Sequence, residues 1–129
     1  MYKYTIDTAS NVIRIEFEGE ISLEEYRRLL TELVESPDFQ RSPTMLIDQR
    51  RGRLAVSMEE ARSQPSFILG LQDHLGEPKI ACVTSTDYDY GMNRMFELSS
   101  EDILNHTGKV FRDMDEACEW LGLSGGDQE

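Results

Sequence analysis

The sequence predicts a single α/β domain built on a five-stranded mixed sheet that is mainly parallel, with four main helices. Two observations predict this class. Apolar side chains first alternate with polar ones, as along half-buried strands, and then recur every three or four residues, as along amphipathic helices. Short apolar runs then alternate with helical patterns, giving the order β-β-α-β-α-β-α-β-α. Strands that alternate with helices favour parallel pairing through right-handed crossovers.

The first two strands are expected to form a hairpin. Residues 2–7 and 12–18 both alternate strictly, and a short polar link at 8–11 joins them. Two alternating runs so joined predict an antiparallel pair, which adds one antiparallel edge strand to the sheet. The side chains expected to face inward are Tyr2, Tyr4, Ile6, Ile13, Ile15 and Phe17.

The first helix and the strand after it have clear boundaries. Ser22 with Glu25 three residues later forms a capping box, so the helix should begin at Ser22. The dipeptide Ser36-Pro37 should end it. Residues 44–48 form a short apolar run that predicts a buried strand, and a basic loop is expected to follow at 49–53.

A second capping box, Ser57 with Glu60, opens the next helix. Pro65 lies inside the helical pattern, so a break or kink is expected there, because proline removes a backbone donor. The apolar stripe then resumes, and Gly76 should end it.

The last third of the chain repeats the alternation. Residues 79–84 predict a buried strand, 88 to about 106 a long helix, and 109–112 a short final strand. Asp113 should cap a last helix that Gly122 closes. The domain is therefore expected to span 1–123, with 124–129 as a disordered tail.

Charge excludes several classes of partner. Thirteen Lys and Arg residues against twenty-five Asp and Glu residues give a net charge of −12. Nucleic-acid binding needs clustered positive charge, and anionic membranes repel an acidic chain. One stretch, 41–62, reverses the sign with five basic and three acidic residues. It is the natural place to look for an interaction site.

The cysteines and the N-terminus indicate a protein of the cytoplasm. Cys82 and Cys118 lie in apolar surroundings and predict buried thiols in a reducing compartment. No secretory leader or membrane-length apolar run is present, so no membrane insertion is expected.

His74 and His106 lack metal-ligand spacing, and no nucleophile motif or phosphate loop occurs. The sequence therefore implies no metal, no cofactor and no enzyme activity.

Three passages carry a resemblance to a known family: 13–22 (IRIEFEGEIS), 46–50 (LIDQR) and 90–97 (YGMNRMFE). With the landmarks that follow at 110–113 and 117–121, they resemble the STAS-like family, which includes the anti-sigma factor antagonists and the cytoplasmic domains of sulfate transporters. The chain most resembles the small stand-alone bacterial STAS-like proteins, whose function is uncharacterised. The resemblance implies an α/β fold and a regulatory or interaction role.

The resemblance also singles out Ser57. In anti-sigma factor antagonists, a partner kinase phosphorylates a serine in the loop after the central strand, and counting from Asp48 places Ser57 at that position. Val56 and Met58-Glu59 depart from the family's pattern there. The residues alone predict a plain N-cap at Ser57. Both interpretations, phosphosite and N-cap, remain open at this point.

A candidate binding site lies at the C-terminal ends of the strands, where ligands sit in open parallel sheets. The basic loop and the turn after residue 84 should meet there, and Arg94 could point back at Asp48 as a structural pair. Gly91 could permit close approach of a ligand or a backbone, or could simply allow the helix to pack on the sheet. Met92, Met95 and Phe96 are spaced as core residues or as the wall of an apolar pocket. The candidate ligand- or partner-binding residues are Asp48, Arg50, Arg51, Arg53, Ser57, Thr84, Ser85, Asp87, Tyr88, Tyr90 and Arg94.

Three functions are consistent with this site. The first is a non-enzymatic regulatory or protein-interaction module, because Arg and Tyr often dominate interface energetics; its partner could be another protein or a second copy of the chain. The second is a carrier or sensor for a small anion or an apolar ligand, since STAS-like folds resemble the lipid-carrying CRAL-TRIO domains in layout. The third is an enzyme that uses Asp48, Tyr90 and Arg94. A carrier should contain an enclosed pocket of roughly 300 Å³ or more.

Overall fold

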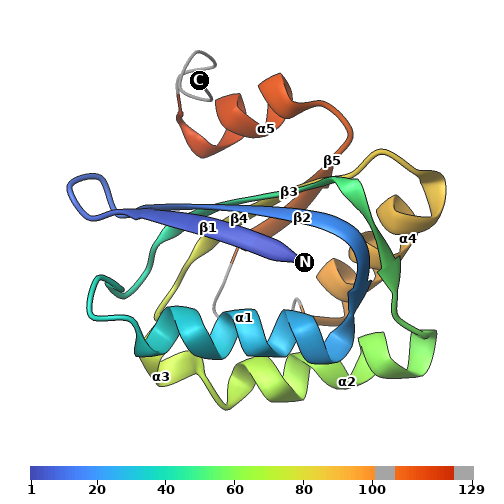
Figure 1. The fold of residues 1–129 in the computed structure, drawn as a ribbon, viewed down its shortest axis with the longest axis horizontal. Coiled ribbons are helices and arrows are strands. Elements are labelled where there is room, and N and C mark those ends of the chain that lie inside the picture. Colours follow the sequence, from blue (N-terminus) through green and yellow to red (C-terminus); the bar gives the residue numbers. More distant parts are fainter. Residues whose placement is uncertain (101–106, 124–129) are drawn as a thin grey trace.

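The computed structural model of the chain describes residues 1–100 and 107–123 (Figure 1). The predicted tail at 124–129 and the predicted end of the long helix at 101–106 lie outside the described residues. The elements run in the order β1 (Tyr2–Asp7), β2 (Val12–Ser22), α1 (Leu23–Glu35), β3 (Thr44–Ala55), α2 (Met58–Leu69), α3 (Gln72–Leu75), β4 (Lys79–Val83), α4 (Asp87–Ser100), β5 (Thr107–Phe111) and α5 (Met114–Leu121).

The five strands form one sheet in the order β1-β2-β3-β4-β5, as the sequence predicts. β1 pairs antiparallel with β2, and every later pair is parallel. Because the parallel strands advance in one direction across the sheet, right-handed crossovers place α1, α2 and α4 on the same face. α5 covers the opposite face, above the sheet in Figure 1.

The core is divided by the sheet into two parts. Between the sheet and α1, alternate residues of β2 and β3 pack against one stripe of the helix, including Phe17, Leu29 and Met45. On the other face, Leu46 and Val83 pack against α5. β4 and the first part of β3, 44–48, are covered on both sides, which explains why these two stretches are mainly apolar.

The helix starts confirm the capping predictions. Ser22, Ser57 and Asp113 are N-caps whose side chains accept hydrogen bonds from the backbone of the residue three positions later. At Ser57 both halves of the capping box are present. At α1, the carboxylate of Glu25 contacts the N-terminal ammonium group of Met1 instead.

The predicted basic loop at 49–53 is wrong, because β3 continues through it to Ala55. β2 is also longer than predicted and runs to Ser22. Glu18 therefore lies opposite Arg51, and Glu20 lies opposite Arg53, so opposite charges face each other across the two strands. These cross-strand pairs favour the extension of both strands. The sequence has no apolar alternation there from which the extension could be predicted.

The predicted break at Pro65 is also misplaced. α2 continues without interruption to Leu69, with Pro65 buried inside it. A proline costs the helix one backbone hydrogen bond, which burial of the apolar ring can offset. The chain leaves the helix at Gly70, and the short helix α3 follows before Gly76.

Candidate functional site

The central geometric feature of the site is that β3 extends beyond the end of its neighbour β4. β4 ends at Val83, opposite Asp48, so the second half of β3 has no strand on its outer edge. Side chains from the next segment take that place. Ser85 Oγ donates to the carbonyl oxygen of Arg50 at 2.9 Å, and Asp89 Oδ1 accepts from the backbone N–H of Leu54 at 3.1 Å. The two segments predicted to meet therefore lie side by side.

A buried polar group lies beneath this junction. Gln49, Thr84 and Asp89 are each at most 1% exposed. The Asn93 amide donates to Gln49 Oε1 at 3.1 Å and to the carbonyl oxygen of Asp89 at 2.8 Å. Gln49, Asp89 and Asn93 were not among the predicted site residues, because polar side chains carry no sign of burial in the sequence. One signal did exist, since Gln49 continues the inward-facing positions Met45 and Ile47 at spacing two.

Asp48 and Arg50 form a two-pronged ion pair. Arg50 Nε donates to Oδ1 and Nη2 donates to Oδ2, both at 2.9 Å, and the Arg50 backbone N–H also donates to Oδ1. Partial burial raises the pKa of Asp48, but the bonds from Arg50 outweigh it and hold that pKa below its usual value. The same bonds raise the pKa of Arg50.

The predicted pairing of Asp48 with Arg94 is wrong. Arg94 pairs with Glu97, one turn along α4. The alternation of side chains between the two faces of β3 explains the error. Asp48 and Arg50 share the strand face of Leu46, which packs toward α5, whereas α4 lies on the opposite face of the sheet.

Two further arginines beside the site, Arg51 and Arg112, form ion pairs. Arg51 pairs with Glu18 at 3.5 Å. Arg112 lies 2.6 Å from Asp87 and stacks over the ring of Tyr90, 4.7 Å from its centroid. Tyr90 is consequently half-buried, and Arg53 lies exposed opposite Glu20 in the strand ladder. Beside Arg51, a hollow of about 230 Å³ is lined by Met1, Tyr2, Lys3, Glu16, Phe17, Glu18 and Arg51.

Ser57 lies exposed at the edge of this region. Its Oγ accepts from the backbone N–H of Glu60 at 3.0 Å, and Glu60 Oε1 accepts in return from the N–H of Ser57. Two large side chains beside it are exposed: Met58 at 52% and Tyr88 at 57%. The Tyr88 hydroxyl donates to the carbonyl oxygen of Val56 at 3.1 Å, which fixes the ring against the start of α2.

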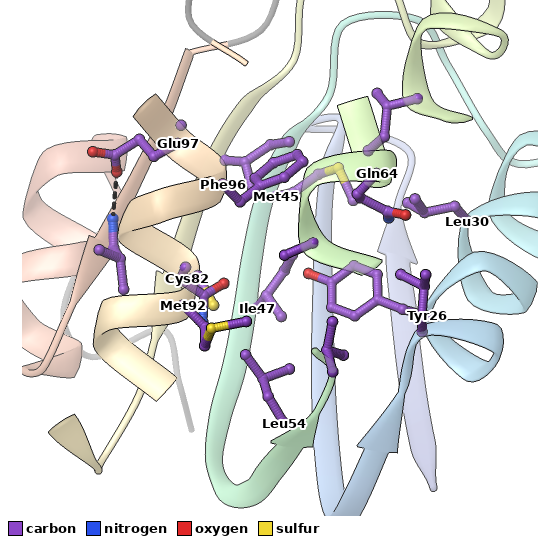
Figure 2. Close-up of a pocket in the computed structure, with 18 of the residues that line it drawn as sticks. Tyr26, Leu30, Met45, Ile47, Leu54, Gln64, Cys82, Met92, Phe96 and Glu97 are labelled. Carbon is purple, nitrogen blue, oxygen red and sulfur yellow. Dashed lines mark hydrogen bonds between the residues drawn. The ribbon is translucent and has the colours of Figure 1, made fainter. Parts of the chain in front are cut away.

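A separate apolar cavity lies between the helices and the sheet (Figure 2). Its volume is about 130 Å³, and α1, α2 and α4 all contribute to its wall. It is lined by Leu23, Tyr26, Leu30, Met45, Ile47, Leu54, Val56, Ala61, Gln64, Ile68, Ile80, Cys82, Met92, Asn93, Phe96, Glu97, Gly108, Lys109 and Val110. Of the three α4 residues predicted as core or wall, Met92 and Phe96 line the cavity and Met95 packs beside Met92.

A comparison with protein families shows to which family the chain belongs. The family described as SpoIIAA-like matches residues 12–122. The chain belongs to the SpoIIAA-like family. The chain is also similar to the crystal structure of an uncharacterised protein from Shewanella loihica, of the DUF3478 family with a SpoIIAA-like fold. That match has a TM-score of 0.57 at 16% identity and covers 93% of each chain. No curated protein matches the sequence significantly.

The predicted resemblance and fold are thus confirmed. Gly91 faces open space, with no described atom within 4 Å of the position that a Cβ would take, so no other part of the described backbone approaches it closely. No described helix is long and apolar enough to cross a membrane. Within residues 1–100 and 107–123, no three His, Cys, Asp or Glu residues are grouped as metal ligands require. His106 lies outside the described residues.

Tyr26 and Cys82 are two of the titratable residues that line the cavity of the SpoIIAA-like domain. Burial raises the pKa of the Tyr26 hydroxyl, with a smaller contribution from Cys82, while the nearby Gln49 amide lowers it. Burial also raises the pKa of the Cys82 thiol, and the negative charges of Asp89 and Asp48 add to this effect. Both groups therefore keep their protons at neutral pH, and Cys82 is an unreactive thiol. Both cysteines are buried, as predicted.

Proposed function

We propose that this SpoIIAA-like domain is a non-enzymatic regulatory module that binds a protein partner at the junction of β3, α2 and α4. The docking surface consists of Arg53, Ser57, Met58 and Tyr88. The proposal includes a cytoplasmic location, which the buried, free thiol of Cys82 supports.

The observation that carries the proposal is the exposure of Met58 and Tyr88. Both side chains are more than half exposed, although Tyr88 is held in place by its bond to Val56. A fixed, exposed tyrosine loses little conformational freedom on binding, and tyrosine and arginine are enriched among residues that dominate interfaces. Arg53 lies close by in sequence on the extended strand and adds positive charge. The surface therefore fits a partner segment with apolar and acidic side chains.

The alternative of a small-anion carrier at the strand ends gains less support. Arg50, Arg51 and Arg112 are each paired with a carboxylate. The helices that begin at this edge would normally attract anions, but α1, α2, α4 and α5 all carry acidic residues in their first turn. An incoming anion would meet these charges.

The enzyme alternative also gains little from the geometry. Asp48 is bound by Arg50, Tyr90 lies beneath Arg112, and Arg94 is paired with Glu97. The three side chains considered as catalytic are therefore held by different partners and share no common site.

Site-specific photo-cross-linking tests the docking surface. The cross-linker p-benzoylphenylalanine replaces Met58 in one variant and Thr5, an exposed residue of β1, in a matched control. In cells of the source organism, we expect a discrete adduct from position 58 that the control does not form and that Tyr88→Ala abolishes. An adduct of twice the chain mass would identify a second copy as the partner. Identical adducts from both positions, or none from position 58, would contradict the proposal.

A further inference from the structure

We propose that the outer edge of β1 is a self-association surface, at which two copies of this chain pair antiparallel into one continuous sheet. This edge is distinct from the docking surface, and the pairing does not depend on a protein partner there. Three features of β1 carry the inference: an open backbone edge, a half-buried row of side chains, and two opposite charges spaced for an antiparallel pair.

The outer backbone edge of β1 is open. β1 is the first strand in the sheet order and pairs with β2 on its inner side (Figure 1). Met1 and Glu18 exchange two backbone hydrogen bonds. Because bonded and non-bonded positions alternate along an antiparallel pair, the N–H and C=O groups of Tyr2, Tyr4 and Ile6 point away from β2. Among the described residues, no group bonds to them, so another strand can.

The opposite edge of the sheet is treated differently. There the backbone N–H of Val110 on β5 donates to the side chain of Glu97 on α4, at 3.0 Å. Folded proteins often protect an exposed edge with a proline, a bulge or a covering segment. β1 contains no proline and no bulge, and no described side chain does for it what Glu97 does for β5. An edge left open in this way favours strand addition.

The side chains of β1 that face α1 form a row that is only partly covered. Tyr2, Tyr4 and Ile6 pack against the main core and remain half-buried, whereas Phe17, the neighbour of Tyr2 on β2, is 1% exposed. The rings of Tyr2 and Tyr4 stack, with centroids 6.5 Å apart. A strand added at this edge would cover the exposed parts of the row, and burial of that apolar surface would stabilise the pair.

Two charges select a second copy of the chain as the added strand. On the other face of β1, Lys3 and Asp7 are exposed and lie two positions on either side of Thr5. When two β1 strands pair antiparallel about a twofold axis at Thr5, Lys3 lies directly opposite Asp7 of the second copy, and symmetry repeats the contact. Lys3 Nζ also lies 3.6 Å from Glu16, but the Lys3 side chain is 81% exposed and can reach both carboxylates.

The same register fits the backbone and the opposite face. Tyr4 would lie opposite Ile6 of the second copy, and an aromatic side chain beside a β-branched one is a favourable cross-strand pair. Both are positions whose backbone points outward, so the two symmetric contacts form four hydrogen bonds between the copies. The product is one sheet of ten strands, five from each copy. Because one short strand from each copy makes a small interface, the dimer should be reversible, in the micromolar range.

Analytical ultracentrifugation of the intact chain tests the pairing and the surface together. Lys3→Glu places like charges opposite each other twice in the dimer, whereas Lys109→Glu makes the same change on β5, at the other edge of the sheet. The parent chain should be largely dimeric at about 200 μM. Lys3→Glu should weaken dimerisation about tenfold or more, because both symmetric contacts become repulsive, and Lys109→Glu should leave it nearly unchanged.

Cysteine variants test the register. Both native cysteines are buried, so a cysteine on the exposed face of β1 is the accessible thiol. After oxidation, Thr5→Cys should form a disulfide across the twofold axis. Lys3→Cys alone should not, because its two copies lie roughly 13 Å apart along the strands, beyond the reach of a disulfide. A mixture of Lys3→Cys and Asp7→Cys chains should cross-link.

A parent chain that remains monomeric at about 200 μM would overturn the inference. Equal effects of Lys3→Glu and Lys109→Glu, or disulfides from Lys3→Cys as readily as from Thr5→Cys, would also contradict it.

The photo-cross-linker at position 5 keeps this inference separate from the docking surface. Its adduct should have twice the chain mass, link β1 to β1, and survive Tyr88→Ala, so it differs from any adduct formed at position 58. An adduct of position 5 with another protein would show that the edge serves a different partner.

Discussion

The backbone N–H of Leu54 donates to the carboxylate of Asp89, 35 residues later in the chain, at 3.1 Å. This bond fastens the start of α4 to the exposed edge of β3. Asp89 is only 1% exposed, so the bond is shielded from water. It joins the two segments that form the docking surface and places Tyr88, the preceding residue, against α2.

The first prediction concerns this bond. Asp89→Ala should lower the free energy of unfolding by about 1–3 kcal/mol, because a buried N–H loses its partner. Asp87→Ala, two residues earlier on the exposed side of α4, should change it little. Chemical denaturation of both variants measures the difference. Equal losses would show that the Leu54–Asp89 bond does not stabilise the junction.

The second prediction concerns two glycines that the structure treats differently. A Cβ on Gly52 would lie 2.7 Å from Ile21 Cδ1 and 3.2 Å from the carbonyl oxygen of Gly19, so Gly52→Ala should destabilise the domain by about 1–3 kcal/mol. A Cβ on Gly91 meets nothing within 4 Å. Gly91→Ala should therefore stabilise the domain by about 0.5–1 kcal/mol, because alanine favours the helix. Thermal unfolding would contradict this if the two effects had the same sign.

The third prediction concerns acid stability. The folded pKa of Asp48 is lowered, so the unfolded chain binds this proton at a higher pH than the folded chain does. The ion pair therefore contributes fully above the unfolded pKa, near 4, and its contribution is lost as the pH falls through the lowered value. Because the pair is partly exposed, the effect should not exceed about 1 kcal/mol.

In the parent chain, the free energy of unfolding should fall as the pH is lowered from 5 through about 4. Asp48→Asn and Arg50→Gln should each make this fall less steep. Urea denaturation over that range measures it. If the parent chain and both variants lose stability in parallel, the pair is not the origin of the pH dependence.

The fourth prediction concerns the start of α2. Ser57→Ala should cost about 1 kcal/mol of stability, since the N–H of Glu60 loses its acceptor. Ser57→Asp should retain most of the stability because aspartate also caps helices. Denaturation of the two variants distinguishes a cap from a residue with no structural role: equal stability of the parent chain and Ser57→Ala would exclude the cap.

The elements that the sequence predicted well are those with a local signal. The capping boxes and the change of hydrophobic period mark the helix starts, and the alternation at 2–7 and 12–18 marks the hairpin. These signals act within a few residues. The strand order follows from the alternation of strands and helices along the chain, because right-handed crossovers place successive parallel strands side by side.

The errors arise where long-range contacts decide the structure. The extension of β3 depends on Glu18 and Glu20, which lie more than thirty residues before their partners Arg51 and Arg53. The wrong pairing of Asp48 followed from treating that extension as a loop, which hid the strand face on which Asp48 lies. Gln49 and Asp89 were missed because each is polar and yet fully buried, which only the junction with α4 makes favourable.

The decisive measurement for the docking surface is the affinity of the cross-linked partner, once purified, for two charge-reversed variants. Arg53→Glu changes the docking surface, and Arg28→Glu makes the same change of charge on the exposed side of α1. Isothermal titration calorimetry should show at least a tenfold loss of affinity for Arg53→Glu and little change for Arg28→Glu, because the partner contacts the extended strand. Equal affinities for the two variants would contradict the proposal that this junction is the surface at which the domain acts.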